Sequence, residues 1–96
     1  MNQTITLNLP YNLSDEDWQT VQKVYENIDG WKGYIIDGCP TWFGSENDER
    51  YVWASVEPSG LLLSGNLPND IWAGWLTVLC AKLSVALNLE IHDSEM

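Results

Sequence analysis

Positive charge is scarce in this 96-residue chain. Four basic residues stand against fourteen carboxylates, and the formal net charge is −10 at pH 7 with the single histidine neutral. A surface with so few cations can displace few counterions from a phosphate backbone, so nucleic acid is not an expected partner. The same negative field repels anionic membrane surfaces and speeds encounter with basic proteins. The composition therefore favours a basic protein as the partner.

Histidine and cysteine are almost as rare, which limits the chemistry that the chain can support. No metal-ligand spacing links His92 to Cys39 or Cys80, and phosphate-binding glycine loops, nucleophile elbows and paired-histidine motifs are missing. A relay from Cys39 to His92 and Asp93 fails on a strand, where adjacent side chains point to opposite faces. We therefore expect no catalytic residues, no metal, no cofactor and no enzymatic activity.

The start of the chain has no targeting signal. The segment "MNQTITLNLP" contains neither a basic residue nor an apolar core, so it does not fit a signal peptide. Two cysteines without a shared motif are expected as reduced thiols, although a Cys39–Cys80 disulfide stays open as an alternative. Together these features predict a cytoplasmic protein.

The hydrophobic pattern predicts one α+β domain over residues 1–96. Residues 3–9 alternate as a half-buried strand. Ser14 is a good N-cap for a helix that Gly30 stops. A strand at 34–37 and a hairpin follow, and the hairpin turns at Glu57-Pro58-Ser59-Gly60. A second helix comes next, capped by Asn69 and ended by Asn88, and then "LEIHD" at residues 89–93 as a last strand.

These elements predict a two-layer architecture in the order β-α-β-β-β-α-β. Two helices on one face of a four- to five-stranded, mostly antiparallel sheet is the simplest way to bury both helical stripes. The long loop that begins at residue 38 could hold one further short strand at 41–43. The sequence does not predict the order of the strands in the sheet.

The second helix is apolar almost all the way round, with Lys82 as its only charge between residues 71 and 91 apart from Glu90. Its length would allow a membrane span, but the acidic remainder and the lack of flanking basic residues favour a core helix and no membrane contact. One sheet cannot cover so wide an apolar arc. A homodimer is therefore possible, with Trp72, Trp75 and Leu76 as its expected face.

The loop "GCPTWFGSENDE" combines an aromatic pair with carboxylates. Trp42 and Phe43 stand beside glycine and proline, and Glu46, Asp48 and Glu49 follow closely. An apolar centre with a charged rim is typical of protein interfaces. We therefore expect these five residues to bind the partner. The alternative is a loop folded over the edge of the core, with its acidic side chains merely solvated.

The sequence thus favours a small acidic protein-binding module. Its physical type is that of inhibitors or immunity proteins that neutralise a basic partner in bacteria. One alternative is a small-molecule-binding domain in which Trp31, Trp42 and Trp53 line an apolar pocket. Another is a subunit that self-assembles as a homodimer through the second helix and carries no activity of its own.

Overall fold

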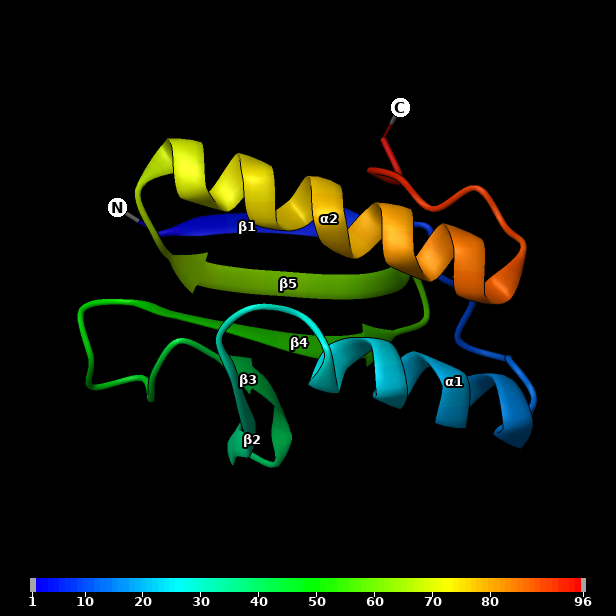
Figure 1. Ribbon diagram of the computed structural model, residues 1–96, viewed down its shortest axis with the longest axis horizontal. Helices are drawn as coiled ribbons and strands as arrows, with labels where there is room; N and C mark the ends of the chain where they lie inside the picture. Colours follow the sequence, from blue (N-terminus) through cyan, green and yellow to red (C-terminus); the bar gives the residue numbers. More distant parts are fainter. Residues whose placement is uncertain (1, 96) are drawn as a thin grey trace.

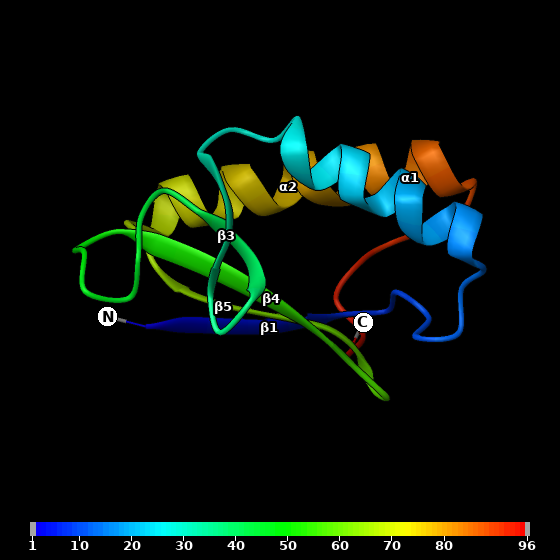
Figure 2. The same ribbon diagram turned by 90° about the horizontal axis from the view of Figure 1, so that it is seen from below.

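A computed structural model describes residues 2–95, which form a five-stranded sheet with two helices on one face (Figures 1 and 2). In chain order the elements are β1 (Gln3–Leu7), α1 (Asp15–Glu26), β2 (Trp31–Ile36), β3 (Cys39–Trp42), β4 (Tyr51–Glu57), β5 (Gly60–Asn66) and α2 (Asn69–Leu87). All strand pairs are antiparallel. The expected α+β class and two-layer arrangement are therefore confirmed.

The strands lie in the order β1-β5-β4-β3-β2. From β1 at one edge, α1 carries the chain to the opposite edge, and β2 to β5 return as a meander. The β4–β5 turn is the predicted one, with Pro58 and Ser59 between the paired residues Glu57 and Gly60. Gly60 has a φ of +136°, and a Cβ there would collide with the carbonyl oxygen of Leu7. This close approach locks the turn against β1.

Both helices begin and end close to the expected residues. Ser14 caps α1, because its Oγ accepts a hydrogen bond of 3.1 Å from the Asp17 N–H. The helix ends at Glu26, four residues before Gly30. Asn69 is the first residue of α2 rather than its cap, since Pro68 takes that place without a side-chain hydrogen bond. Asn88 ends α2 in the left-handed conformation, as predicted.

The two helices share the core with the inner face of the sheet. In Figure 1, α2 runs over β1 and β5, and α1 lies beside it on the same face. The buried apolar residues are Leu7, Leu9, Val21, Tyr25, Ile28, Ile36, Trp42, Val52, Ala54, Leu61, Leu63, Leu67, Trp75, Leu76, Leu79, Leu83 and Ile91. Most were expected from the alternation of the strands and from the helical stripes.

The element order differs from the prediction at two places. The optional strand near 41–43 exists as β3, and the last strand expected at 89–93 is replaced by an isolated pairing of Asp93 with Leu7. Only a few hydrogen bonds join this segment to β1, including Asn8 N–H to the His92 carbonyl at 3.0 Å and Ser94 N–H to the Thr6 carbonyl at 2.8 Å. The observed order is therefore β-α-β-β-β-β-α.

Candidate functional site

The expected aromatic anchor of the partner site lies in the core. Trp42 is 0% exposed, and its Nε1–H donates to the carbonyl oxygen of Tyr25 at 3.0 Å. Its ring packs edge-on against Tyr25 and against Trp75, with centroids 5.4 and 5.0 Å away. Trp42 therefore cannot contact a partner, because β3 turns its side chain toward the helices. The alternative of a segment folded over the core is correct for this residue.

The neighbouring loop is held by its own polar groups. Phe43 is half-buried, and its N–H donates to the Gly30 carbonyl at 2.7 Å. Asp48 Oδ2 accepts a hydrogen bond of 2.8 Å from the Ser45 N–H, so this carboxylate stabilises the turn of the loop. Glu46 and Glu49 remain exposed. The five predicted contact residues are thus close in space, but they do not form an aromatic surface with a charged rim.

Two of the three residues expected at a dimer face are also core residues. Trp75 and Leu76 are buried, and the Nε1–H of Trp75 donates to the Asp29 carbonyl at 3.0 Å. Trp72 is half-buried and stacks on Trp75 at 6.5 Å between centroids. Trp75 and Leu76 therefore do not form the expected dimer face, because they pack in the core, and any dimer contact would need the other side of the helix.

The three tryptophans expected to line a ligand pocket do not lie together. Trp31 pairs with Trp42 on the inner side of the sheet, whereas Trp53 pairs with Thr41 and belongs to the outer side. None of the hollows described below is lined by any of the three. The Cys39–His92–Asp93 relay is likewise separated, since Cys39 is in β3 and Asp93 pairs with β1 at the far edge.

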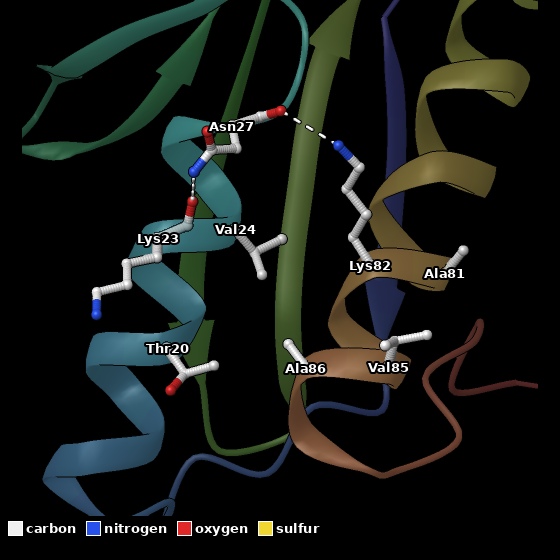
Figure 3. A pocket seen from close by; sticks show the side chains of 8 residues that line it. All are labelled: Thr20, Lys23, Val24, Asn27, Ala81, Lys82, Val85 and Ala86. Carbon is white, nitrogen blue, oxygen red and sulfur yellow. Dashed lines mark hydrogen bonds between the residues drawn. The ribbon is translucent and has the colours of Figure 1, made fainter.

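A groove runs between the two helices on the side away from the sheet (Figure 3). It measures about 500 Å³, and Val24 of α1 faces Lys82 and Ala86 of α2. Lys23 and Val85 line its rims, and their side chains point away from the opposite helix. The described residues that line it include no carboxylate. Lys82 Nζ donates to the Asn27 carbonyl at 3.4 Å across the groove. Two of the four basic residues in the chain therefore flank an apolar floor.

The side of α2 that faces solvent is also apolar. Ile71, Gly74, Val78, Ala81 and Val85 are all exposed, and we call them the outer stripe of α2. By length and composition α2 could cross a membrane, and only 17% of its most apolar window is buried in the fold. The helix was expected to lie in the core, but only the side with Trp75, Leu76, Leu79 and Leu83 is buried. The sequence indicated the outer stripe only through the apolar character of the whole helix surface.

A second hollow lies on the other side of α1, between that helix and the β2–β3 hairpin. We call it the α1–hairpin crevice. It measures about 240 Å³, and its walls include Trp18 and Tyr25 of α1, Tyr34 and Cys39 of the hairpin, and Val56 of β4. The residues that line it among those described include no lysine or arginine. Sequence reasoning missed this site because its walls come from three distant segments.

Carboxylates surround the α1–hairpin crevice. Burial raises the pKa of the Tyr34 phenol, and the nearby Glu26 carboxylate raises it further. Burial also raises the pKa of the Cys39 thiol, and the negative charges of Asp37 and Glu57 add to this effect. Both shifts have the sign of a negative local potential. The crevice is therefore an aromatic hollow with an acidic margin.

The floor of the crevice contains an unsatisfied polar atom. Tyr25 is 3% exposed, and its hydroxyl has no hydrogen-bond partner within the described part of the chain. Burial raises the pKa of this phenol well above its usual range, with a smaller contribution from Tyr34. Buried hydroxyls without a partner are uncommon and costly. The oxygen has almost no exposed surface, so the hydrogen-bond donor of a ligand can reach it only when the crevice opens.

The thiols and the metal-ligating side chains offer little further chemistry. Cys39 and Cys80 are both free, so the open question of a disulfide is answered. Burial raises the pKa of Cys80 as well, and Asp93 adds to it. Within residues 2–95 no three His, Cys, Asp or Glu side chains gather as a metal site. No family model, curated protein or solved structure is similar enough to this chain to show a relationship.

Proposed function

We propose that this protein is a non-catalytic binding module that recognises a basic protein partner through the α1–hairpin crevice. The observation that carries the proposal is the unsatisfied hydroxyl of Tyr25 in an aromatic hollow with an acidic margin. The net charge of −10 supports it, because the field of the whole molecule steers a basic partner toward this surface. The crevice replaces the loop of Trp42 and Phe43 as the expected centre of contact.

An arginine side chain of the partner matches the crevice chemically. A guanidinium group stacks on aromatic faces and carries five N–H donors. Trp18 and Tyr34 offer rings, and the buried Tyr25 oxygen offers an acceptor once the crevice opens. The carboxylates of Asp37 and Glu57 would balance its charge at the margin. A lysine fits less well, since its compact ammonium cannot form a planar stack.

Binding rather than catalysis is favoured by the state of the nucleophiles. The pKa values of both Cys39 and Cys80 are raised, so these thiols stay protonated at neutral pH. The thiolate is the reactive form of cysteine. Reduced thiols of this kind are also consistent with the cytoplasmic location that we propose for the protein.

Two double variants with equal charge test the site. Asp37→Asn with Glu57→Gln removes the acidic margin of the crevice, and asparagine tolerates the left-handed φ of +52° at position 37. Glu46→Gln with Glu49→Gln makes the same change in net charge on the β3–β4 loop. The wild-type protein and both variants are used to capture proteins from host lysate at low and moderate salt, followed by mass spectrometry.

The expected result is one basic protein that is retained at moderate salt by the wild type and by the loop variant. The crevice variant should lose it at the same salt, because the guanidinium would lose its counter-charges. Equal loss from both double variants would mean that only total charge matters. If only the loop variant failed to retain the basic protein, the binding site would include Glu46 and Glu49, and the proposal would be contradicted.

A further inference from the structure

We propose that two copies of this chain associate through the outer stripe of α2, with their helices antiparallel. This surface is separate from the α1–hairpin crevice. The groove beside α2 uses Val24 and Asn27 of α1, whereas the crevice uses Trp18 and Tyr25 on another side of that helix. The inference is therefore independent of the partner proposed above, and either can fail alone.

The spacing of the outer stripe is that of a helix-pairing seam. Ile71, Gly74, Val78, Ala81 and Val85 follow alternating steps of three and four residues. Such steps keep one narrow face of a helix turned toward a second helix. Val85 is 84% exposed and Val78 is 45% exposed, so this seam is uncovered in the monomer.

The seam is complementary to itself when one helix is reversed. Branched side chains occupy 71, 78 and 85, and the positions between them hold Gly74 and Ala81. In an antiparallel pair, Val85 of one copy faces Gly74 of the other, and Val78 faces Ala81. A two-fold axis repeats each contact, so Val78 and Val85 both meet small residues, while Ile71 lies at the end of the seam opposite Asn88. A foreign partner is not needed to explain this pattern.

Charge also favours a second copy over other occupants. The chain carries −10, yet it has no carboxylate from Ile71 to Leu89, and the carboxylates that border the stripe, Asp29 and Asp70, lie only near its Ile71 end. Two copies therefore meet with little like-charge repulsion along the rest of this face. Lys23 and Lys82 flank the adjacent groove and oppose a basic partner there (Figure 3). The acidic remainder opposes an anionic membrane. The outer stripe is thus the natural contact between acidic molecules of the same kind.

The available area fits a weak, reversible dimer. At about 1.5 Å per residue, the 19 residues of α2 extend for about 28 Å, and a single helix is about 10 Å wide. Two copies that meet along α2 alone bury about 560 Å² in total, which is the size of a transient contact rather than of a stable interface. We therefore expect weak association, with dissociation at about 0.1 to 1 mM.

Sedimentation equilibrium of the full chain tests this inference between about 10 µM and 3 mM, which brackets that range. The mass should rise from one monomer to two. Val78→Asp should weaken association at least about tenfold, because it buries a charge in the seam. Val56→Asp is the matched control, since Val56 has the same 45% exposure but lies on β4. It should dimerise like the wild type.

Gly74→Leu distinguishes a closely packed helix pair from non-specific apolar association. A Cβ at Gly74 has no atom within 4 Å, so the monomer accepts the larger side chain. In the proposed dimer the leucine collides with Val85 of the other copy and weakens association. Non-specific apolar contact would instead become stronger. Circular dichroism of each variant confirms that the fold is kept.

Three results would overturn the inference. The first is a monomer at every concentration. The second is an equal effect of Val56→Asp and Val78→Asp on the mass. The third is tighter association of Gly74→Leu. Phosphatidylcholine vesicles are added in a parallel run, and a protein that stays monomeric in water but binds them through Val78 would assign the outer stripe to a lipid surface instead.

Discussion

The polar atoms of the aromatic core are almost all satisfied, which makes Tyr25 unusual. The indole N–H groups of Trp42 and Trp75 each donate to a backbone carbonyl at 3.0 Å, one in α1 and one in the turn after it. The first bond ties α1 to β3 of the sheet, and the second ties α2 to the turn after α1. The hydroxyl of Tyr25 lies in the same cluster without a partner. A buried hydroxyl without a partner lowers the free energy of unfolding. Its presence here is consistent with a hydrogen bond to a bound partner.

Tyr25→Phe should therefore separate stability from binding. Removing an unsatisfied buried hydroxyl is expected to raise the free energy of unfolding by about 1 kcal/mol. The same change should weaken capture of the basic partner, because the acceptor on the crevice floor is lost. Urea unfolding of both proteins measures the first effect. A clear loss of stability would show that the hydroxyl is satisfied in solution.

The same variant has a defined pH dependence. Folding raises the pKa of Tyr25, so the phenol ionises more readily in the unfolded chain than in the folded protein. This difference has no effect on the free energy of unfolding below the unfolded pKa of about 10, and it lowers that free energy as the pH rises above 10. The wild type should thus lose stability above about pH 10 more steeply than Tyr25→Phe. Parallel slopes for the two proteins between neutral and alkaline pH would contradict this assignment.

Gly30 tests the contact between the end of α1 and the β3–β4 loop. Its φ is +91°, and a Cβ there would lie 2.8 Å from the ring of Phe43. Gly30→Ala should lower the free energy of unfolding by more than about 1 kcal/mol. Gly74→Ala is the control, because that helical position has open space and gains about 0.5 to 1 kcal/mol from alanine. Thermal unfolding compares the two variants.

At the scale of elements, local chemistry was sufficient to predict α1, the β4–β5 hairpin and the end of α2. Ser14, Pro58 and Asn88 act where the sequence placed them, because caps and turns depend on a few neighbouring residues. The absence of a strand at residues 89–93 could not be predicted from local sequence. The alternation of this segment fits a strand, but strand formation depends on the free edge of β1, which allows only one isolated pairing.

The candidate site was harder to predict than the fold. Trp42 lies in a loop-like sequence, and its burial follows from the pairing of β3 with β4, which brings distant residues together. The α1–hairpin crevice needs α1, the hairpin and β4 in register. The outer stripe of α2 was visible in the sequence as surplus apolar surface. Deciding which side faced the sheet required the packing of Trp75 and Leu76.

The end of α2 offers a test at this scale. Asn88 has a left-handed φ of +55°, and its N–H donates to the Ser84 carbonyl. Asn88→Ala should lower the free energy of unfolding by about 1 kcal/mol, because alanine is strained in this conformation, whereas Asn88→Gly should be neutral. Guanidinium unfolding gives both values. Equal effects of the two substitutions would contradict a cost that comes from the backbone conformation.

At the scale of the whole molecule, the charge of −10 acts against the compact state. Raising the ionic strength from about 10 mM to about 0.5 M should therefore raise the melting temperature, since the Debye length shortens from about 30 Å to a few ångströms. A variant with Glu46, Glu49, Glu90 and Glu95 changed to Gln should respond less. A melting temperature that does not change with salt would show that the charges are already too far apart to interact.

The crevice lies between α1 and the β2–β3 hairpin, and α2 packs on the other side of α1, so a dimer through α2 would leave both crevices open. Each dimer would then offer two sites for the basic partner. A partner with repeated basic segments would bind such a dimer more tightly than the monomer, without any new contact, because the second segment binds from a high local concentration. Dilution below the dimer dissociation constant would remove that advantage.

The pairing between the start and the end of the described chain also affects when the fold can be completed during synthesis. Asn8 and His92 are separated by 84 positions, and the hydrogen bonds between them lie just beyond the end of β1. The strand β1 pairs with β5, and at a synthesis rate of 5 to 20 residues per second about 1 to 5 s pass between Asn66, the last residue of β5, and His92. During that interval the edge of β1 is open to strands of neighbouring nascent chains. The speed of translation thus becomes a determinant of how much of this protein reaches its native state.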